Sequence, residues 1–181
     1  MLCTTIAVAL LVATPATAAE FHRDPQPNNR PDHIAIWGHI QTNDEQKFVE
    51  LTAGLKDATI MLNSPGGSIW PSMRIGTVIR ERGWETHASF GCNSACAFIW
   101  LAGRFRTLGR LAWLGFHSTT QKAGSNERSE WGNQIIAAYL KSLDLPQEVI
   151  ELATQADPRD IKFIGYDEAK ALGLIRPRRA F

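Results

Sequence analysis

The sequence predicts an α/β fold with parallel strands, and two of its features favour this class. Between His33 and His117, short runs rich in β-branched residues alternate with stretches that have the apolar spacing of amphipathic helices. Gly, Pro and Asn gather where one kind of run gives way to the other. A length of 181 residues fits one domain with a substantial core, and a net charge of +1 gives no indication of a nucleic-acid or anionic-membrane partner.

The first 19 residues predict a cleaved secretory signal peptide. Residues 6–13 are apolar, Pro15 breaks the chain after them, and small residues follow up to the expected cleavage after Ala18 or Ala19. A membrane anchor is the weaker alternative, because this run is well short of the roughly 20 residues that span a bilayer. We therefore expect a periplasmic or secreted protein with no membrane span after cleavage. Residues 20–32 are polar and proline-containing and predict a flexible arm, and residues 33–181 predict a single domain.

The elements of that domain follow in order. Residues 33–40 alternate as a strand does, with His33 and His39 as outward polar positions, and a helix begins near Asn43. A strand is expected over residues 59–62, a helix over 69–82 and a strand over 85–89. A helix over residues 97–102, ended by Gly103, precedes a strand over 111–116. The intervening Arg104, Arg106 and Arg110 predict a charged loop surface. After a polar loop, residues 130–143 and 146–156 predict two amphipathic helices.

Three residue types at strand ends indicate acyl-transfer chemistry. Ser94 occupies a strand-to-helix turn, where a hydroxyl can cap the helix or act as a nucleophile beside helix N–H groups that favour negative charge. The Gly66-Gly67 turn can expose backbone N–H groups to a ligand, although such turns are usually only turns. His117 ends a strand, where a general base could reach the hydroxyl. Acyl transfer needs a nucleophile, a base and oxyanion donors, and all three types occur here.

The order of these motifs resembles that of a known family. Asn-Ser-Pro-Gly-Gly-Ser at residues 63–68, the run from Gly91 to Gly103 and the terminal His117 resemble the proteolytic subunit of Clp protease, within the ClpP/crotonase superfamily. The resemblance covers residues 34–175 approximately, and it implies a ββα spiral with a C-terminal helical handle region. It also implies no cofactor and no metal. A homo-oligomer would form through the handle, although the same two helices can equally cover the sheet of one subunit.

The resemblance also implies roles for individual residues. Ser94 is the nucleophile, His117 is the base, and the N–H groups of Gly67 and Ala95 form the oxyanion hole. A peptide substrate would add as a strand beside the residues that follow the glycines, with backbone hydrogen bonds giving affinity. The substrate-binding residues are then Ser68, Ile69 and Trp70.

The third member of a catalytic triad is less well matched. At the position where the family has its acid, this chain has Ile161, and Asp160 lies one residue away. Because a one-residue slip in a strand points a side chain to the opposite face, Asp160 requires an irregular backbone, and Asp157 is a second candidate. A Ser-His dyad without an acid, or an inactive protein, would also fit the sequence. A serine-lysine arrangement is weaker, because no lysine lies in the motif region.

Cys92 and Cys96 flank the serine. An even pair in an exported chain predicts a disulfide, and at a helix start their Cα atoms can lie within the range that disulfides accept. Zinc is a weaker alternative, because the spacing differs from the usual two residues and no histidine pair follows. A cysteine nucleophile paired with His117 also stays open.

Together these observations predict a periplasmic serine endopeptidase that cleaves extended or unfolded peptides through an acyl-enzyme. It is expected to work without ATP, because the exported compartment has no ATP supply. The alternative is a non-catalytic module that binds an extended peptide in the same groove. An acyl-CoA enzyme of the crotonase type is a third interpretation, which export and the Ser/His pair disfavour.

Overall fold

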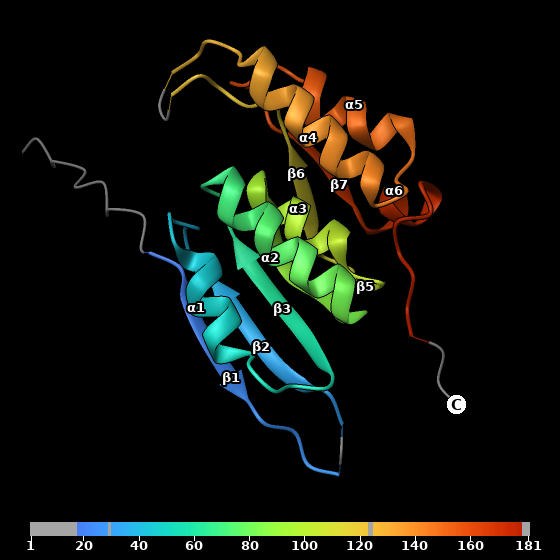
Figure 1. Cartoon of the computed structure of the whole chain (residues 1–181). Helices are drawn as coiled ribbons and strands as arrows, with labels where there is room; N and C mark the ends of the chain where they lie inside the picture. Colours follow the sequence, from blue (N-terminus) through green and yellow to red (C-terminus); the bar gives the residue numbers. More distant parts are fainter. Residues whose placement is uncertain (1–17, 29, 123–124, 179–181) are drawn as a thin grey trace, which may run out of the picture.

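The computed structural model describes residues 18–28, 30–122 and 125–178, and it has the predicted α/β architecture (Figure 1). Except for Ala18 and Ala19, the predicted signal peptide lies outside the described residues. Within the described part of the chain, no helix has both the length and the apolar composition needed to cross a membrane.

Thirteen helices and strands make up the described chain. The strands are β1 (Glu20–Asp24), β2 (Asp32–Trp37), β3 (Ala58–Ser64), β4 (Glu85–Asn93), β5 (Phe105–Leu108), β6 (Trp113–Phe116) and β7 (Lys162–Gly165). The helices are α1 (Asp44–Leu51), α2 (Ile69–Arg82), α3 (Ala95–Ala102), α4 (Glu130–Ser142), α5 (Gln147–Gln155) and α6 (Tyr166–Ala171).

All seven strands form one sheet, in the order β1-β2-β3-β4-β6-β7, with β5 paired to β4 beside this path. The pairs of β2 with β3, β3 with β4, and β4 with both β5 and β6 are parallel, as the sequence predicts. The strands at the two edges, β1 and β7, run antiparallel to their neighbours. Because β3, β4 and β6 are parallel, their carboxyl ends meet at the same edge of the sheet, and the candidate site residues follow these ends.

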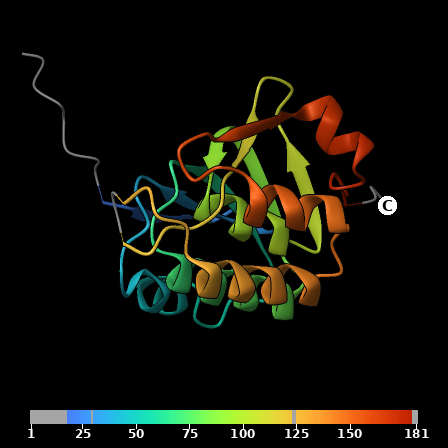
Figure 2. The ribbon, with the colours of Figure 1, turned by 90° about the horizontal axis from the view of Figure 1, so that it is seen from above.

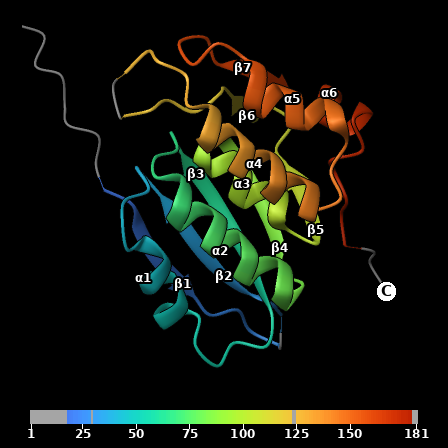
Figure 3. The same cartoon turned by 45° about the horizontal axis from the view of Figure 1, so that its top comes forward.

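Helices α1, α2 and α3 lie along the sheet, and α4 runs alongside α2 and α3, with α5 beside it (Figure 1, Figure 2 and Figure 3). Every residue of α3 is buried, which explains its continuous apolar sequence. The Tyr139 hydroxyl of α4 donates a hydrogen bond to the Phe98 carbonyl of α3, and it lies so close to Gly76 of α2 that a Cβ there would collide with it. The apolar faces of α4 and α5 are thus buried within the chain, at Ile136, Leu140, Val149, Ile150 and Ala153.

Strand β4 has an irregular register against β3 just before the candidate site. Leu62 of β3 pairs with Ala88, but Ser64, two residues on, pairs with Cys92, four residues on, so β4 carries extra residues there. At the same place β4 changes its neighbour from β5 to β6. Bulges of this kind bend a strand and are common beside active sites. Here the bulge lies in the last part of β4, shortly before Ser94.

The structure corrects two predictions of local structure. The arm at residues 20–32 is not flexible throughout, because its first part is β1, which pairs with β2 along its length. The arginine-rich segment is not only a charged loop surface, because it contains β5 and the buried side chain of Arg106. The Arg106 guanidinium donates hydrogen bonds to the carbonyls of Leu174 and Gly103. Burial lowers the pKa of Arg106 to about 10, so the side chain stays charged near neutral pH.

Candidate active site

Ser94 occupies the joint between β4 and α3, as predicted, in an unusual backbone conformation. Its φ of 52° and ψ of −123° are rare for a residue with a side chain, and such strained residues cluster at active sites. The hydroxyl forms no capping hydrogen bond with α3. Ser94 therefore does not serve as the ordinary helix cap that its position would suggest, and its hydroxyl is left for another purpose.

Contacts from three directions hold this turn. The Ser94 N–H donates to the Gly115 carbonyl of β6 at 2.7 Å, and the Ser94 carbonyl accepts from the Ala97 N–H at 2.9 Å. Gly66 packs directly against the turn, because a Cβ added there would lie 2.8 Å from the Ser94 Cβ. Only glycine leaves room for the turn of Ser94 at this position. Gly66 was predicted as part of the glycine turn, but its packing against Ser94 was not predicted.

The disulfide partners flank the same turn. The Sγ atoms of Cys92 and Cys96 are bonded at 2.03 Å, with their Cα atoms 5.2 Å apart, and both residues are fully buried. A paired sulfur cannot act as a thiolate, so neither cysteine is a nucleophile in this structure. Among the residues described, no three His, Cys, Asp or Glu side chains gather to hold a metal ion.

Gly67 and Ala95 are the residues whose N–H groups were predicted to form an oxyanion hole. Gly67, at φ +139°, lies so close to Ile40 that a Cβ would collide with the Ile40 carbonyl. On either side of it, the Gly66 carbonyl accepts from the Ile40 N–H and the Ser68 N–H donates to the Ile40 carbonyl, each at 2.8 Å. Within the described chain, the N–H groups of Gly67 and Ala95 donate no hydrogen bond. Gly67 lines the groove that contains Ser94, whereas Ala95 is fully buried at the N-terminus of α3.

His117 follows the last residue of β6, and its ring is oriented by the main chain. The Nδ1 atom lies 2.9 Å from the Ser118 carbonyl oxygen. A carbonyl can only accept, so in the neutral ring Nδ1 carries the proton and Nε2 keeps its lone pair. That is the tautomer a general base requires, and here a main-chain carbonyl selects it.

Further hydrogen bonds fix the segment that carries this carbonyl. The buried Ser118 donates its N–H to the Ala156 carbonyl at 3.2 Å, and Asn133 of α4 accepts from the Thr119 N–H at 2.9 Å. Asn133 is only 4% exposed and shares a helix face with Ile136 and Leu140. It was not predicted as a site residue, although a polar residue on an apolar helix face was the signal that could have identified it.

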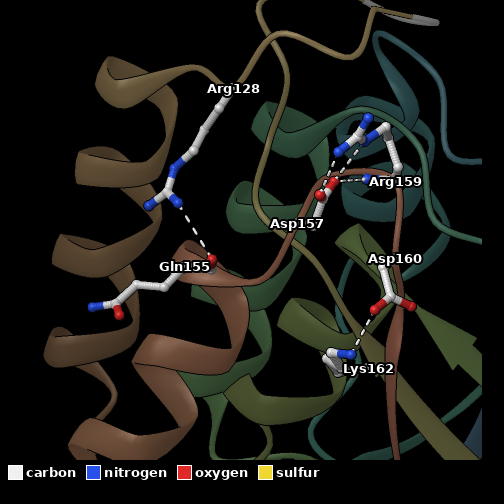
Figure 4. A network of polar contacts seen from close by, with 6 residues as sticks. All are labelled: Arg128, Gln155, Asp157, Arg159, Asp160 and Lys162. Atoms are coloured by element: carbon white, nitrogen blue, oxygen red, sulfur yellow. Dashed lines mark hydrogen bonds and ion pairs between the residues drawn. The ribbon is translucent and has the colours of Figure 1, made fainter.

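The structure does not bring the predicted acid to the histidine. The Asp160 carboxylate accepts from the Lys162 ammonium at 2.5 Å, and Asp157 forms a two-pronged pair with Arg159 at 2.7 and 3.0 Å (Figure 4). Hydrogen bonds from the Arg159 side chain and N–H hold the pKa of Asp157 below its usual range. The Asp160 side chain is therefore paired with Lys162 and not with His117, whose Nδ1 atom faces the Ser118 carbonyl.

Ser94, Gly67 and His117 line one groove of about 870 Å³. Its apolar wall includes Phe98 of α3 and Ile136 of α4. Ser94 and His117 are half-buried, and no hydrogen bond joins the described side chains of these two residues. Catalytic hydrogen bonds often tighten only when substrate binds, so this geometry is compatible with a working pair.

The predicted substrate-binding residues Ser68, Ile69 and Trp70 all line the groove. Ser68 is extended, whereas Ile69 and Trp70 belong to the first turn of α2, as the predicted helix over residues 69–82 requires. Helical residues cannot offer the edge of a sheet to a peptide.

Thr120, in the segment after His117, also lines the groove. It forms an antiparallel bridge with Arg128, while the flanking hydrogen bonds run from the Gln121 N–H to the Glu127 carbonyl and from the Ser129 N–H to the Thr119 carbonyl. In such a pair the N–H and carbonyl of the central residue point away from its partner. Within the described chain, these two main-chain groups of Thr120 form no hydrogen bond.

Solved structures of proteases share this fold. The membrane-bound stomatin-specific protease 1510-N, in a complex with a substrate peptide, matches with a TM-score of 0.62 and 19% identity, over 78% of this chain and 71% of that chain. The ClpP catalytic domain of Plasmodium falciparum matches with 0.59 and 21%, over 76% and 78%. ClpP1 of Listeria monocytogenes matches with 0.55 and 19%, over 79% and 88%.

These similarities confirm the predicted ClpP-like fold, and at such low identity they establish the fold alone. No protein-family model matches the sequence, and a search of curated proteins finds none that is similar to it.

Proposed function

From the ClpP-like fold and the groove at Ser94, we propose that this chain is a serine endopeptidase that cleaves extended or unfolded peptides. The observation that carries the proposal is the strained turn of Ser94, whose hydroxyl is free of any capping role and lies in one groove with His117 and the Gly67 N–H. Strained backbone conformations of this kind persist mainly at functional sites, where the strained geometry is part of the mechanism.

The reaction follows from the protonation states. His117 Nε2 accepts the proton of the Ser94 hydroxyl while Oγ attacks the carbonyl carbon of the scissile peptide bond. The carbonyl oxygen becomes negative and accepts hydrogen bonds from the N–H groups of Gly67 and Ala95. The tetrahedral intermediate then expels the amine, which takes the proton from His117, and leaves an acyl group on Oγ. Water, deprotonated by His117, attacks the acyl carbon, and the bond to Oγ then breaks while Oγ takes the proton back from His117, which releases the acid and the free serine.

The Ser118 carbonyl takes the orienting role of a triad acid. It accepts from Nδ1 and thereby keeps Nε2 directed away from its own strand, and its partial negative charge stabilises the imidazolium that forms during the reaction. A neutral carbonyl stabilises a cation less than a carboxylate does. We therefore expect a lower kcat than that of an enzyme with a complete triad.

The substrate lies extended along Thr120. Main-chain hydrogen bonds to this residue give affinity without demanding a particular sequence, which suits unfolded peptides. Neither aspartate nor glutamate is among the described residues that line the groove, whereas Lys122, His39 and His117 do line it. Neutral or acidic substrate segments thus fit this groove better than basic ones.

The proposed location is the periplasm or the cell exterior. It rests on the signal-like first 19 residues and on the buried cysteine pair, because oxidising compartments form and keep disulfides. Work without ATP is proposed on the same ground, since an exported enzyme has neither ATP nor an unfoldase to deliver substrate.

A non-catalytic peptide-binding module is the second candidate. It is favoured by one observation, the absence of a hydrogen bond between the described side chains of Ser94 and His117. Such a module would keep the groove and the Thr120 edge and would have no use for the strain at Ser94.

Hydrolysis of an unstructured fluorogenic peptide by wild type, Ser94→Ala and His117→Ala decides between the two. We expect turnover by wild type and a loss of at least about 10³-fold in each variant, with no further loss in the double variant, because the two residues act as a unit. Circular dichroism is expected to show the same fold in all proteins. Peptide binding without turnover by wild type would establish the module instead.

A further inference from the structure

A second cavity, of about 190 Å³, opens beside the main groove. It shares Ile69, Trp70 and Thr120 with that groove, and Trp131 and Ile135 of α4 complete its apolar lining. The two cavities are thus continuous along the segment where an extended peptide would lie. The proposed chemistry at Ser94 uses neither tryptophan.

The two tryptophans come from different helices and meet over this cavity. Trp70 lies in the first turn of α2 and Trp131 in the first turn of α4, and their ring centroids are 6.0 Å apart at an angle of 53°. Trp70 is 53% exposed and Trp131 is 66% exposed. Large aromatic side chains that stay exposed together mark surfaces that bind other apolar groups.

Local packing holds Trp131 in this place. Ser129 caps α4 by accepting from the Gly132 N–H at 3.1 Å. Gly132 faces Thr119 so closely that an added Cβ would lie 2.5 Å from the threonine methyl group. Glycine thus lets the start of α4 approach the peptide-binding edge, which brings the neighbouring Trp131 to the groove.

We propose that this cavity is a specificity subsite that binds one aromatic side chain of the peptide substrate, at a residue away from the scissile bond. The inference rests on the proposed peptidase function and adds the class of side chain that the groove selects. A cavity of about 150 Å³ with apolar walls is enough to hold benzene, so about 190 Å³ accommodates a single ring.

The chemistry of the walls favours an aromatic ring over other groups. No charged side chain of the described chain lines the cavity, so a charged substrate residue would lose its hydration without gaining a partner. Indole rings interact with a further aromatic ring through edge and face contacts, beyond the gain from burial. Gln121 and Ser129 at the wall can accept a hydrogen bond from a tyrosine or tryptophan side chain.

The test uses unstructured peptides of one parent sequence in which each position around the scissile bond carries either Phe or Ala. At one position away from the bond, Phe is expected to raise kcat/KM about tenfold over Ala. In Trp131→Ala and in Trp70→Ala this Phe/Ala ratio is expected to fall toward one. Trp37→Ala is the matched control, because Trp37 is 54% exposed and lines neither cavity, and it is expected to keep the ratio.

A binding measurement separates this inference from the proposed reaction. In Ser94→Ala, which cannot form an acyl-enzyme, calorimetry is expected to show the same preference for the Phe peptide, lost on adding Trp131→Ala. If the wild type hydrolyses no peptide but the binding preference for Phe is observed, the proposed peptidase function is refuted and the proposed subsite is supported. Equal affinity for Phe and Ala peptides at every position, or a preference that survives in both tryptophan variants, overturns the subsite.

Discussion

Replacing Gly66 by alanine tests whether the turn of Ser94 is the reactive centre. The added Cβ would lie 2.8 Å from the Ser94 Cβ and 2.7 Å from the Asn93 carbonyl oxygen, closer than Cβ atoms approach such groups. Because these neighbours belong to the main chain and to the nucleophile itself, relief requires the turn to move. A misplacement of about 1 Å typically costs about 10²-fold in rate, so Gly66→Ala is expected to lower kcat/KM at least about a hundredfold.

Gly54→Ala is the matched control. Gly54 also has a positive φ, of +75°, but an added Cβ would have nothing within 4 Å. Alanine in such a conformation costs roughly 1–2 kcal/mol of stability, which corresponds to a fall in Tm of about 2–8 °C for a chain of this size. We expect Gly54→Ala to lose this stability and to keep its kcat/KM. Steady-state kinetics and thermal melting by circular dichroism measure both quantities. If folded Gly66→Ala keeps the rate of the control, the reaction does not occur at Ser94.

Three further predictions follow from the surroundings of the site. Asp160→Asn is expected to leave kcat within about twofold of wild type, because the carboxylate pairs with Lys162 and not with the histidine; a loss of about 10²-fold or more would restore Asp160 as a triad acid. The Cys92→Ala, Cys96→Ala variant is expected to show a clear fall in kcat with only a small fall in Tm, because the bridge closes a small loop around Ser94 and contributes only about 2 kcal/mol to stability. A large fall in Tm with an unchanged kcat would show that the pair only stabilises the packing of the core. An oligomer is predicted by resemblance alone, and light scattering that gives a monomer at micromolar concentration would refute it.

The parts of the site that the sequence predicts depend on local signals. The glycine turn at residues 66–67 and the serine at the end of β4 are adjacent to runs whose periodicity defines a strand and a helix, so both could be located without long-range information. Helix α2 was predicted from its apolar spacing with the same bounds that the structure shows, and Pro71 suits its first turn.

The rest depends on contacts between distant segments. Arg106 is buried where its guanidinium donates a hydrogen bond to the carbonyl of Leu174, a residue that is distant in the sequence. Nothing in the local sequence distinguishes Arg106 from its exposed neighbours. The same holds for the orientation of His117, which the chain obtains from the Ser118 carbonyl, and for Asp160, whose partner was decided by side-chain placement. Side-chain pairing of this kind is a property of the folded chain, so sequence spacing could name the candidates but could not choose among them.

Labelling with a fluorophosphonate probe tests the central claim most directly, because the probe phosphonylates only a serine that a neighbouring base and an oxyanion hole activate. The wild-type protein is expected to gain one probe mass, located on Ser94 by peptide mass spectrometry, and His117→Ala is expected to gain none. Wild-type protein that is folded and stays unlabelled, or a label on any other serine, would contradict the claim that Ser94 and His117 form the catalytic pair.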